Sequence, residues 1–185
     1  MALFTGKGDG GTTKLFDSKP GARVSKSSPI FECLGQLDEL NAVAGWARIG
    51  CADNFDLEGE RVKDILHAVQ NHLFTIQAEA AGAGKSVPQE SVEKLSRLID
   101  SIEAQLPETK SFLILGRTEL SARFDIARAI SRRAERRLVA LHESRERLIS
   151  ESSRAYANRL SSLFYALARL HNARAGIIEE PPTYQ

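Results

Sequence analysis

The chain has 185 residues, 42% of them hydrophobic, which is enough for one domain to bury a core without disulfide or metal support. Its 25 Lys and Arg residues nearly balance 24 Asp and Glu residues, giving a formal net charge of +1. This balance excludes the overall basic surface of a typical nucleic-acid-binding protein, so any anionic ligand must bind at a local cluster of cations.

The sequence predicts neither a signal peptide nor a membrane span. No apolar run follows a basic cluster at the start, and no stretch of about 18 apolar residues occurs anywhere. Cys33 and Cys51 have neither metal-ligand spacing nor the density of a secreted disulfide scaffold. We therefore expect a cytoplasmic protein with no membrane or nucleic-acid partner.

The first segment, residues 1–30, is rich in glycine and hydroxyl side chains. Between Phe4 and Lys14 it reads Phe-Thr-Gly-Lys-Gly-Asp-Gly-Gly-Thr-Thr-Lys, a composition that excludes a regular helix. Its glycines allow successive backbone N–H groups to converge on a phosphate, and Lys26 adds a cation further along. The glycine spacing is not that of a Walker A loop, and a mobile Gly-rich tail is the alternative interpretation.

Five stretches carry apolar residues at alternating spacings of three and four, which is typical of helices with one buried face. The predicted helices cover residues 31–48, 60–81, 90–105, 118–143 and 153–175. Joined by short or moderate connections, they predict an all-α, up-and-down bundle over residues 31–176 that forms one domain with the N-terminal segment. The tail, residues 177–185, has little to bury and is expected to be disordered.

The fourth predicted helix carries a dense set of cations. Arg128, Arg132 and Arg136 follow one another at steps of four residues, and each step turns an ideal helix by only about 40°, so they form a row beside the apolar seam. A row of guanidinium groups suits a polyanion such as a nucleotide triphosphate. Ordinary surface ion pairs along the helix are the alternative.

Asp38 lies beside the apolar seam of the first predicted helix. A carboxylate in such a place is either solvated or paired with a cation from a neighbouring helix, and Arg132 is the partner we expect. His67 and His72 are five residues apart, which separates them by about 140° on a helix and argues against a two-histidine metal site. The sequence thus predicts no metal site built from protein side chains.

A short apolar run, Ser111-Phe112-Leu113-Ile114-Leu115-Gly116, interrupts the connection between the third and fourth helices. Such a run is usually core filler. If it instead keeps Phe112 at the mouth of a cavity, it provides an apolar wall for a bulky ligand.

Four short motifs occur in order along the chain. They are Thr-Gly-Lys-Gly-Asp-Gly-Gly at 5–11, Gly-Gln-Leu-Asp-Glu-Leu-Asn at 35–41, Arg-Arg-Ala-Glu-Arg at 132–136 and Asn-Arg-Leu-Ser at 158–161. Together with the helical background they make residues 4–176 resemble the PduO-type ATP:cob(I)alamin adenosyltransferases. The resemblance implies a homotrimer that transfers the 5′-deoxyadenosyl group of ATP to the cobalt of cob(I)alamin or a related corrinoid, with Mg²⁺ present, and releases triphosphate.

The resemblance also implies roles for individual residues, at sites shared between adjacent subunits. The expected ATP-binding residues are Thr5, Gly6, Lys7, Gly8, Thr13, Lys14, Lys26, Arg132, Arg133, Glu135, Arg136 and Asn158. The catalytic set would be Arg132, Arg136 and Asp38, the last through a salt bridge to Arg132. Phe112 would contact the corrinoid and keep the lower axial base off cobalt. A reductase and a cobalamin-dependent acceptor enzyme are the implied protein partners.

The chain departs from the family pattern in three motifs. Gly6 stands where the family has lysine, with Lys7 displaced by one position, and Ser162 replaces an aspartate on the fifth helix. Leu115-Gly116-Arg117 replaces the usual Pro-Gly-Gly after Phe112. A non-catalytic paralogue that binds ATP or cobalamin as a carrier or regulator is therefore the alternative function, and a ligand-free helical scaffold is a third.

Overall fold

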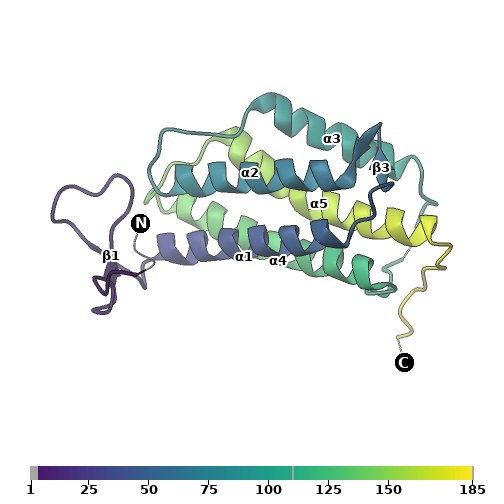
Figure 1. Cartoon of the computed structure of the whole chain (residues 1–185), viewed down its shortest axis with the longest axis horizontal. Helices are drawn as coiled ribbons and strands as arrows, with labels where there is room; N and C mark the ends of the chain where they lie inside the picture. Colours follow the sequence, from purple (N-terminus) through teal and green to yellow (C-terminus); the bar gives the residue numbers. More distant parts are fainter. Residues whose placement is uncertain (1–3, 110, 185) are drawn as a thin grey trace.

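The computed structural model describes residues 4–109 and 111–184 and contains a bundle of five long helices (Figure 1). They are α1 (Pro29–Gly50), α2 (Val62–Ala80), α3 (Gln89–Glu103), α4 (Glu119–Glu143) and α5 (Glu151–Arg174). Successive helices run in opposite directions, so the predicted all-α, up-and-down bundle is confirmed, with every boundary within two residues of its predicted position. Residues 1–3 of the predicted N-terminal segment and Gln185 of the predicted tail lie outside the described residues.

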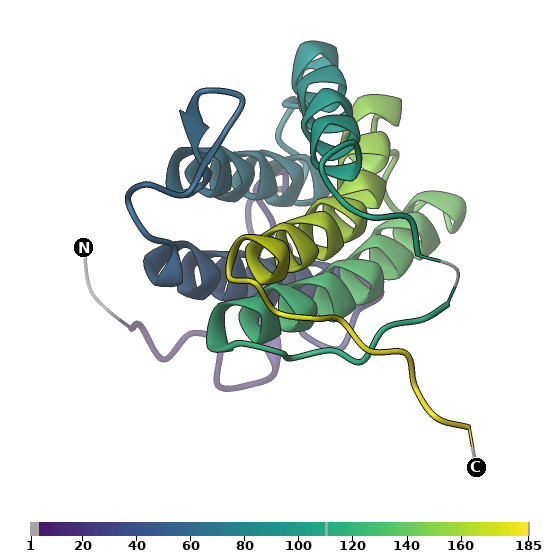
Figure 2. The same cartoon turned by 90° about the vertical axis from the view of Figure 1, so that its right-hand side faces the viewer.

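The core lies between the apolar faces of the helices. α1 packs against α2 and α4, and α5 packs against α3 and α4, which leaves α3 at one edge of the bundle (Figure 2). Phe124 on α4 and Phe164 on α5 are the largest fully buried side chains, and burial of an aromatic or aliphatic side chain of this kind contributes about 1.5–3 kcal/mol. The seam predicted for α4 is buried along its whole length, which fixes the face that its arginines occupy.

The start of α4 is set by a reciprocal cap. The backbone N–H of Ser121 donates to Thr118 Oγ1 at 3.1 Å, and the backbone N–H of Thr118 donates to Ser121 Oγ at 2.9 Å. These bonds satisfy backbone groups that the first helical turn leaves unpaired. The helix therefore begins at a defined residue directly after the loop that carries Phe112.

Two short antiparallel strand pairs were not predicted. β1 (Thr12–Thr13) pairs with β2 (Val24–Ser25), and β3 (Asp56–Leu57) pairs with β4 (Glu60–Arg61). Two-residue strands are too short to show the alternation by which a strand is recognised in a sequence. The first pair closes the N-terminal segment into a hairpin that projects beyond the end of the bundle (Figure 1).

The described residues of the loop at 107–117, which exclude residue 110, lie together with the tail up to Tyr184 at the opposite end of the bundle from the N-terminal segment (Figure 1). The backbone N–H of Ile114 donates to the Glu180 carbonyl oxygen at 2.8 Å, and Arg117 donates to both carboxylate oxygens of Glu180 at 3.0 and 3.2 Å. These bonds join the tail to a loop that is distant from it in the sequence, and the expected disorder of residues 177–185 stays a prediction. None of the helices in the described part of the chain is long and apolar enough to cross a membrane.

Candidate functional site

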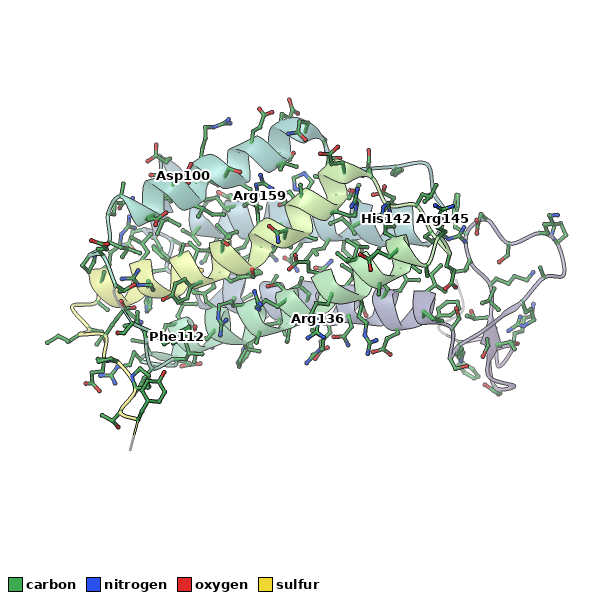
Figure 3. The ribbon with its side chains drawn as sticks, turned by 180° about the vertical axis from the view of Figure 1, so that it is seen from behind. Asp100, Phe112, Arg136, His142, Arg145 and Arg159 are labelled. Atoms are coloured by element: carbon green, nitrogen blue, oxygen red, sulfur yellow. The ribbon has the colours of Figure 1, made fainter. Side chains whose placement is uncertain are left out.

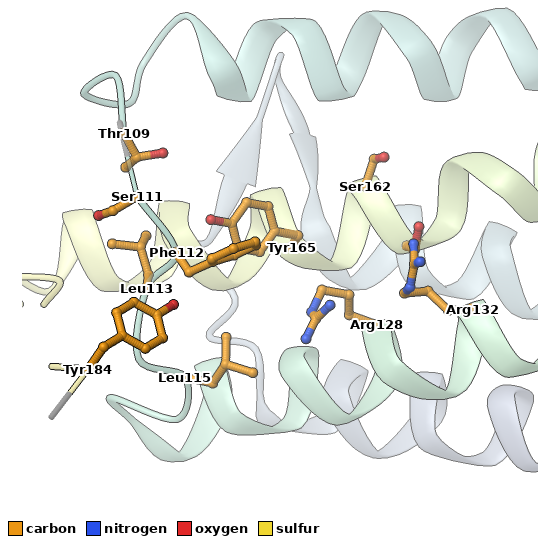
Figure 4. Close-up of a pocket in the computed structure, with 11 residues that line it drawn as sticks. Thr109, Ser111, Phe112, Leu113, Leu115, Arg128, Arg132, Ser162, Tyr165 and Tyr184 are labelled. Carbon is orange, nitrogen blue, oxygen red and sulfur yellow. The ribbon is translucent and has the colours of Figure 1, made fainter. Parts of the chain in front are cut away.

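A cavity of about 1030 Å³, here called the large cavity, opens between the 107–117 loop, the tail, α4 and α5 (Figure 4). It is lined by Thr109, Ser111, Phe112, Leu113, Leu115, Arg128, Arg132, Ser161, Ser162, Tyr165 and Tyr184. Phe112 and Tyr184 supply aromatic surface at one end, and the guanidinium groups of Arg128 and Arg132 lie at the other (Figure 4). Its volume suits a bulky ligand, and Phe112 occupies the wall position expected from the sequence.

A second cavity of about 440 Å³, here called the arginine cavity, lies further along α4. It is lined by Arg132, Glu135, Arg136, Val139, Ala140, Glu143 and Asn158. Asn158 Nδ2 on α5 donates to Glu135 Oε1 on α4 at 2.6 Å, so two separate sequence motifs meet here. Four residues predicted to bind the nucleotide are therefore neighbours, and Arg132 lines both cavities.

The arginines of α4 divide into two groups by what they contact. Arg133 donates to Glu39 Oε2 at 2.8 Å and also to Gln36, and Arg137 forms an ion pair with Glu32 at 3.4 Å, so both bridge α4 to α1. Arg132 and Arg136 are exposed and form no ion pair within residues 4–109 and 111–184, and Figure 3 shows Arg136 on the outer face of α4. The surface ion-pair interpretation therefore fits Arg133 and Arg137, while Arg132 and Arg136 remain available to an anion.

The ion pair expected between Asp38 and Arg132 is not formed within the described part of this chain. Asp38 is exposed on α1, and the cations of α4 that reach α1 are Arg133 and Arg137. The two helices present residues one position away from the expected pair, because Glu39 rather than Asp38 faces the partner arginine. A pair between Asp38 and Arg132 of different subunits stays a prediction.

Arg23 organises the glycine-rich loop of the N-terminal segment. Its Nη2 donates to the carbonyl oxygens of Lys7 and Thr12, both at 2.6 Å, and its Nε donates to Thr12 Oγ1 at 2.7 Å. Gly8 lies against Lys26, because a Cβ added to Gly8 would come within 3.0 Å of Lys26 Nζ. The loop thus places two predicted phosphate-binding lysines, Lys7 and Lys26, on the two sides of one hairpin.

Other predicted members of the nucleotide site lie along the same segment. Thr5 and Lys14 are exposed, and Thr13 is half-buried in β1. Gly6 has a φ of 67°, and its carbonyl oxygen accepts a hydrogen bond from the Asp9 N–H at 3.1 Å, so it forms a tight turn that favours glycine.

The N-terminal loop and the arginine row do not meet within one chain. The segment projects past the start of α1, whereas Arg136 lies on the outer face of α4 (Figures 1 and 3). No hydrogen bond or ion pair joins the loop at 5–14 to Arg132 or Arg136 in the part of the chain that the structure describes. Each chain therefore carries two separated parts of the predicted site.

The comparisons with known proteins agree with this geometry. The family described as cobalamin adenosyltransferase matches residues 3–171. The corrinoid adenosyltransferase of Bacillus subtilis (strain 168) is 38% identical over 96% of this chain and 90% of its own length. The chain belongs to the cobalamin adenosyltransferase family.

Other relatives support the same membership. The corrinoid adenosyltransferase PduO of Salmonella typhimurium (strain LT2) is 38% identical over 97% of this chain, which spans only 53% of that protein. Among solved structures, a variant of a PduO-type ATP:corrinoid adenosyltransferase from Lactobacillus reuteri, complexed with cobalamin and ATP, aligns with a TM-score of 0.86 and 26% identity. That alignment covers 99% of this chain and 100% of the other.

Three residues that shape the candidate site were not predicted from the sequence. Arg23 supports the glycine loop, and Tyr184 lines the large cavity from the tail. Asp125 is buried on α4, where its Oδ2 accepts the backbone N–H of Gly116 at 2.9 Å and so anchors the loop that carries Phe112. The sequence offered one signal for Asp125, because it places this carboxylate at an inward-facing position of α4.

Proposed function

We propose that this chain is an ATP:corrinoid adenosyltransferase that transfers the 5′-deoxyadenosyl group of ATP to the cobalt of cob(I)alamin or a related corrinoid. The observation that carries the proposal is that Arg132 lines both cavities. A corrinoid in the large cavity and a triphosphate along the arginine cavity would then meet at one residue. The Lactobacillus reuteri relative, which is complexed with cobalamin and ATP, supports this pairing of ligands.

The reaction requires alignment and charge stabilisation more than acid–base chemistry. Cob(I)alamin is itself a strong nucleophile, so a cobalt–carbon bond forms at the 5′ carbon while the bond from that carbon to the triphosphate oxygen breaks. The electron pair leaves with triphosphate, on which negative charge develops. Arg132 and Arg136 would stabilise that charge, and the two cavities would hold the reactants in line.

Magnesium fits this site as an ion carried by the nucleotide. The described residues contain no group of three or more His, Cys, Asp or Glu side chains that could hold a metal ion. Mg²⁺ commonly keeps several waters and binds one or two carboxylates together with substrate phosphates. Glu135 and Glu143 in the arginine cavity are the carboxylates available for that role, and the ion would neutralise charge on the triphosphate.

Phe112 would act on the corrinoid before alkylation. Its side chain is 79% exposed at the edge of the large cavity, where a bound ligand would cover it. An apolar wall beside cobalt keeps water or the lower base from coordinating, and a lower oxidation state of cobalt favours fewer axial ligands. Phe112 would therefore ease the reduction that produces the nucleophile.

The active unit in this proposal is a homotrimer with sites between subunits. The support is the separation, within one chain, of the glycine loop from Arg132 and Arg136 (Figure 1). A neighbouring subunit would bring its loop over the arginine cavity and its Asp38 to Arg132. Sedimentation should give a trimer at micromolar concentration, and a monomer would contradict the shared site.

The reaction also defines outside partners and a compartment. A reductase must supply cob(I)alamin, and a cobalamin-dependent enzyme would accept the product. We place the enzyme in the cytoplasm, because Cys33 and Cys51 are free thiols, which suits a reducing compartment.

An anaerobic assay with chemically reduced cob(I)alamin and MgATP, followed by absorbance, tests the activity. Wild-type protein should consume cob(I)alamin, and Arg136→Ala should lower kcat/KM at least about tenfold, since a charge-assisted hydrogen bond contributes about 1.5–3 kcal/mol. Arg97→Ala, which removes an exposed arginine from α3, is the matched control. Binding of ATP without consumption of cob(I)alamin would instead establish the carrier or regulator, and absence of ATP binding would leave a scaffold.

A further inference from the structure

Asp17 provides one of the contacts that attach the N-terminal segment to its own bundle. Asp17 lies between β1 and β2, and its Oδ1 accepts a hydrogen bond of 2.8 Å from Nη2 of Arg147, while Nη1 of Arg147 lies 2.8 Å from its Oδ2 in the same ion pair. Arg147 belongs to the connection between α4 and α5. This two-pronged geometry fixes orientation as well as distance, because a planar guanidinium matches a planar carboxylate.

The Asp17 side chain packs against Gly82. This glycine lies just after the end of α2 with a φ of 98°, and a Cβ added there would come within 2.5 Å of Asp17 Cγ. Any side chain at this position would therefore displace Asp17, in addition to straining the backbone. Three connections that are distant in sequence converge on one carboxylate, which is more than a free surface ion pair requires.

A second bond holds the other end of the same stretch. Ser28 Oγ donates to Glu146 Oε1 at 2.8 Å, and Glu146 is the neighbour of Arg147. The stretch from 17 to 28 is thus tied at both ends to the α4–α5 connection. It contains Arg23 and Lys26, which support the glycine loop, so the direction in which that loop projects depends on these ties.

We propose that the Asp17–Arg147 pair, which packs against Gly82, positions the N-terminal segment over the nucleotide, although the pair itself does not contact the nucleotide site. This inference rests on the proposed function, because it assigns the segment to ATP. Asp17, Gly82 and Arg147 are positioning residues that set how well the loop is directed towards the arginine cavity of a neighbouring subunit. Loss of the pair leaves Arg132 and Arg136 unchanged, so it should weaken ATP binding without altering the chemical step.

Charge exchange tests this role directly. Asp17→Arg and Arg147→Asp should each raise the KM for ATP and the calorimetric Kd about fivefold with kcat unchanged, because the cation no longer faces an anion. The double variant Asp17→Arg with Arg147→Asp should restore most of the affinity, which a general loss of stability would not do.

Glycine substitution supplies an independent test with a matched control. Gly82→Ala should weaken ATP binding to a similar extent as loss of the ion pair. Gly176→Ala also adds a Cβ at a positive φ, here 67°, but with nothing within 4 Å of it, and should leave the ATP affinity unchanged. Chymotrypsin cleavage after the exposed Phe16 should accelerate in Arg147→Asp and Gly82→Ala, whose cleavage sequence is intact.

The outcomes separate this inference from the proposed function. Faster cleavage with unchanged ATP affinity would mean that the Asp17–Arg147 pair only orders the loop. Unchanged cleavage would mean that the pair does not hold the segment in place. Either result overturns the inference. Weakened ATP binding that is rescued by the double variant supports it even if the wild type fails to alkylate cob(I)alamin, in which case only the transferase assignment falls. A wild type that binds no ATP overturns both.

Discussion

Asn158 on α5 donates a 2.6 Å hydrogen bond from Nδ2 to Oε1 of Glu135 on α4. The bond connects the Arg-Arg-Ala-Glu-Arg motif to the Asn-Arg-Leu-Ser motif inside the arginine cavity. It also gives a carboxylate beside Arg132 and Arg136 a neutral donor, so that Glu135 is satisfied without neutralising either arginine. An asparagine at position 158 can do both, because its amide donates a hydrogen bond to Glu135 and carries no charge of its own.

Asn158→Asp should therefore weaken ATP binding about tenfold or more. The change places two carboxylates within hydrogen-bonding distance and adds negative charge to the proposed triphosphate site. Asn71→Asp, which adds the same charge on the exposed part of α2, is the control. Calorimetric titration with MgATP gives the comparison, and equal affinities for wild type and Asn158→Asp would exclude the cavity as the phosphate site.

Arg133 should matter less to ATP than its neighbours do. Its guanidinium already bonds Gln36 and Glu39 on α1, so Arg133→Ala should mainly remove an α1–α4 contact, which contributes about 0–1 kcal/mol at this exposure. We expect a small fall in Tm and a loss of ATP affinity well below that of Arg136→Ala. Titration of both variants measures the difference, and equal losses would return Arg133 to the nucleotide site.

Arg117 should govern corrinoid binding through the tail. Its bonds to Glu180 hold the segment that brings Tyr184 to the large cavity. Arg117→Ala should raise the KM for cob(I)alamin about three- to tenfold, the range expected for a partly buried charged contact, and leave the KM for ATP unchanged. Glu180→Gln should behave similarly, and Arg97→Ala should not. A lower KM in Arg117→Ala would mean that the ion pair obstructs corrinoid entry.

The five helices were predictable because each carries a continuous apolar seam over several turns. Leu120, Phe124, Ala127, Leu138 and Leu141 all proved buried in α4. The spacing of three and four predicts an apolar seam of Val92, Leu95, Ile99 and Ile102 on α3, but Ile99 is only partly buried while Leu98 is buried. α3 packs mainly against α5. This single contact, rather than the spacing of the apolar residues, decides which side chains of α3 are buried.

The candidate site was predictable where its residues share a helix. One turn of α4 carries both Arg132 and Arg136, so spacing alone placed them together. Arg147 and Glu180 were not predictable, because each depends on a loop or tail meeting a distant part of the chain. The Asp38–Arg132 pair shows the same limit. The observed pair, Glu39 with Arg133, lies one position further along each helix, and the sequence does not fix the rotation of two neighbouring helices that closely.

Asp125 connects the loop that carries Phe112 to the pH dependence of stability. It is 8% exposed, and burial raises the pKa of its carboxyl above the usual 3.8, although the Gly116 hydrogen bond and the Arg128 charge oppose this. A raised pKa means that the folded state binds the proton more tightly than the unfolded state does. The free energy of unfolding therefore falls as the pH rises from 3.8 through the raised pKa, and the penalty is complete above it.

Asp125→Asn removes this penalty, because an amide is neutral at every pH and its Oδ1 still accepts the Gly116 N–H. At pH 7 the variant should be more stable than the wild type, and the difference should shrink as the pH falls through the raised pKa towards 3.8. Urea unfolding at several pH values measures it, with Asp100→Asn on the exposed face of α3 as the control. A variant less stable than wild type at pH 7 would mean that the ionised carboxylate, held by Arg128 and Gly116, stabilises the loop more than its burial destabilises it.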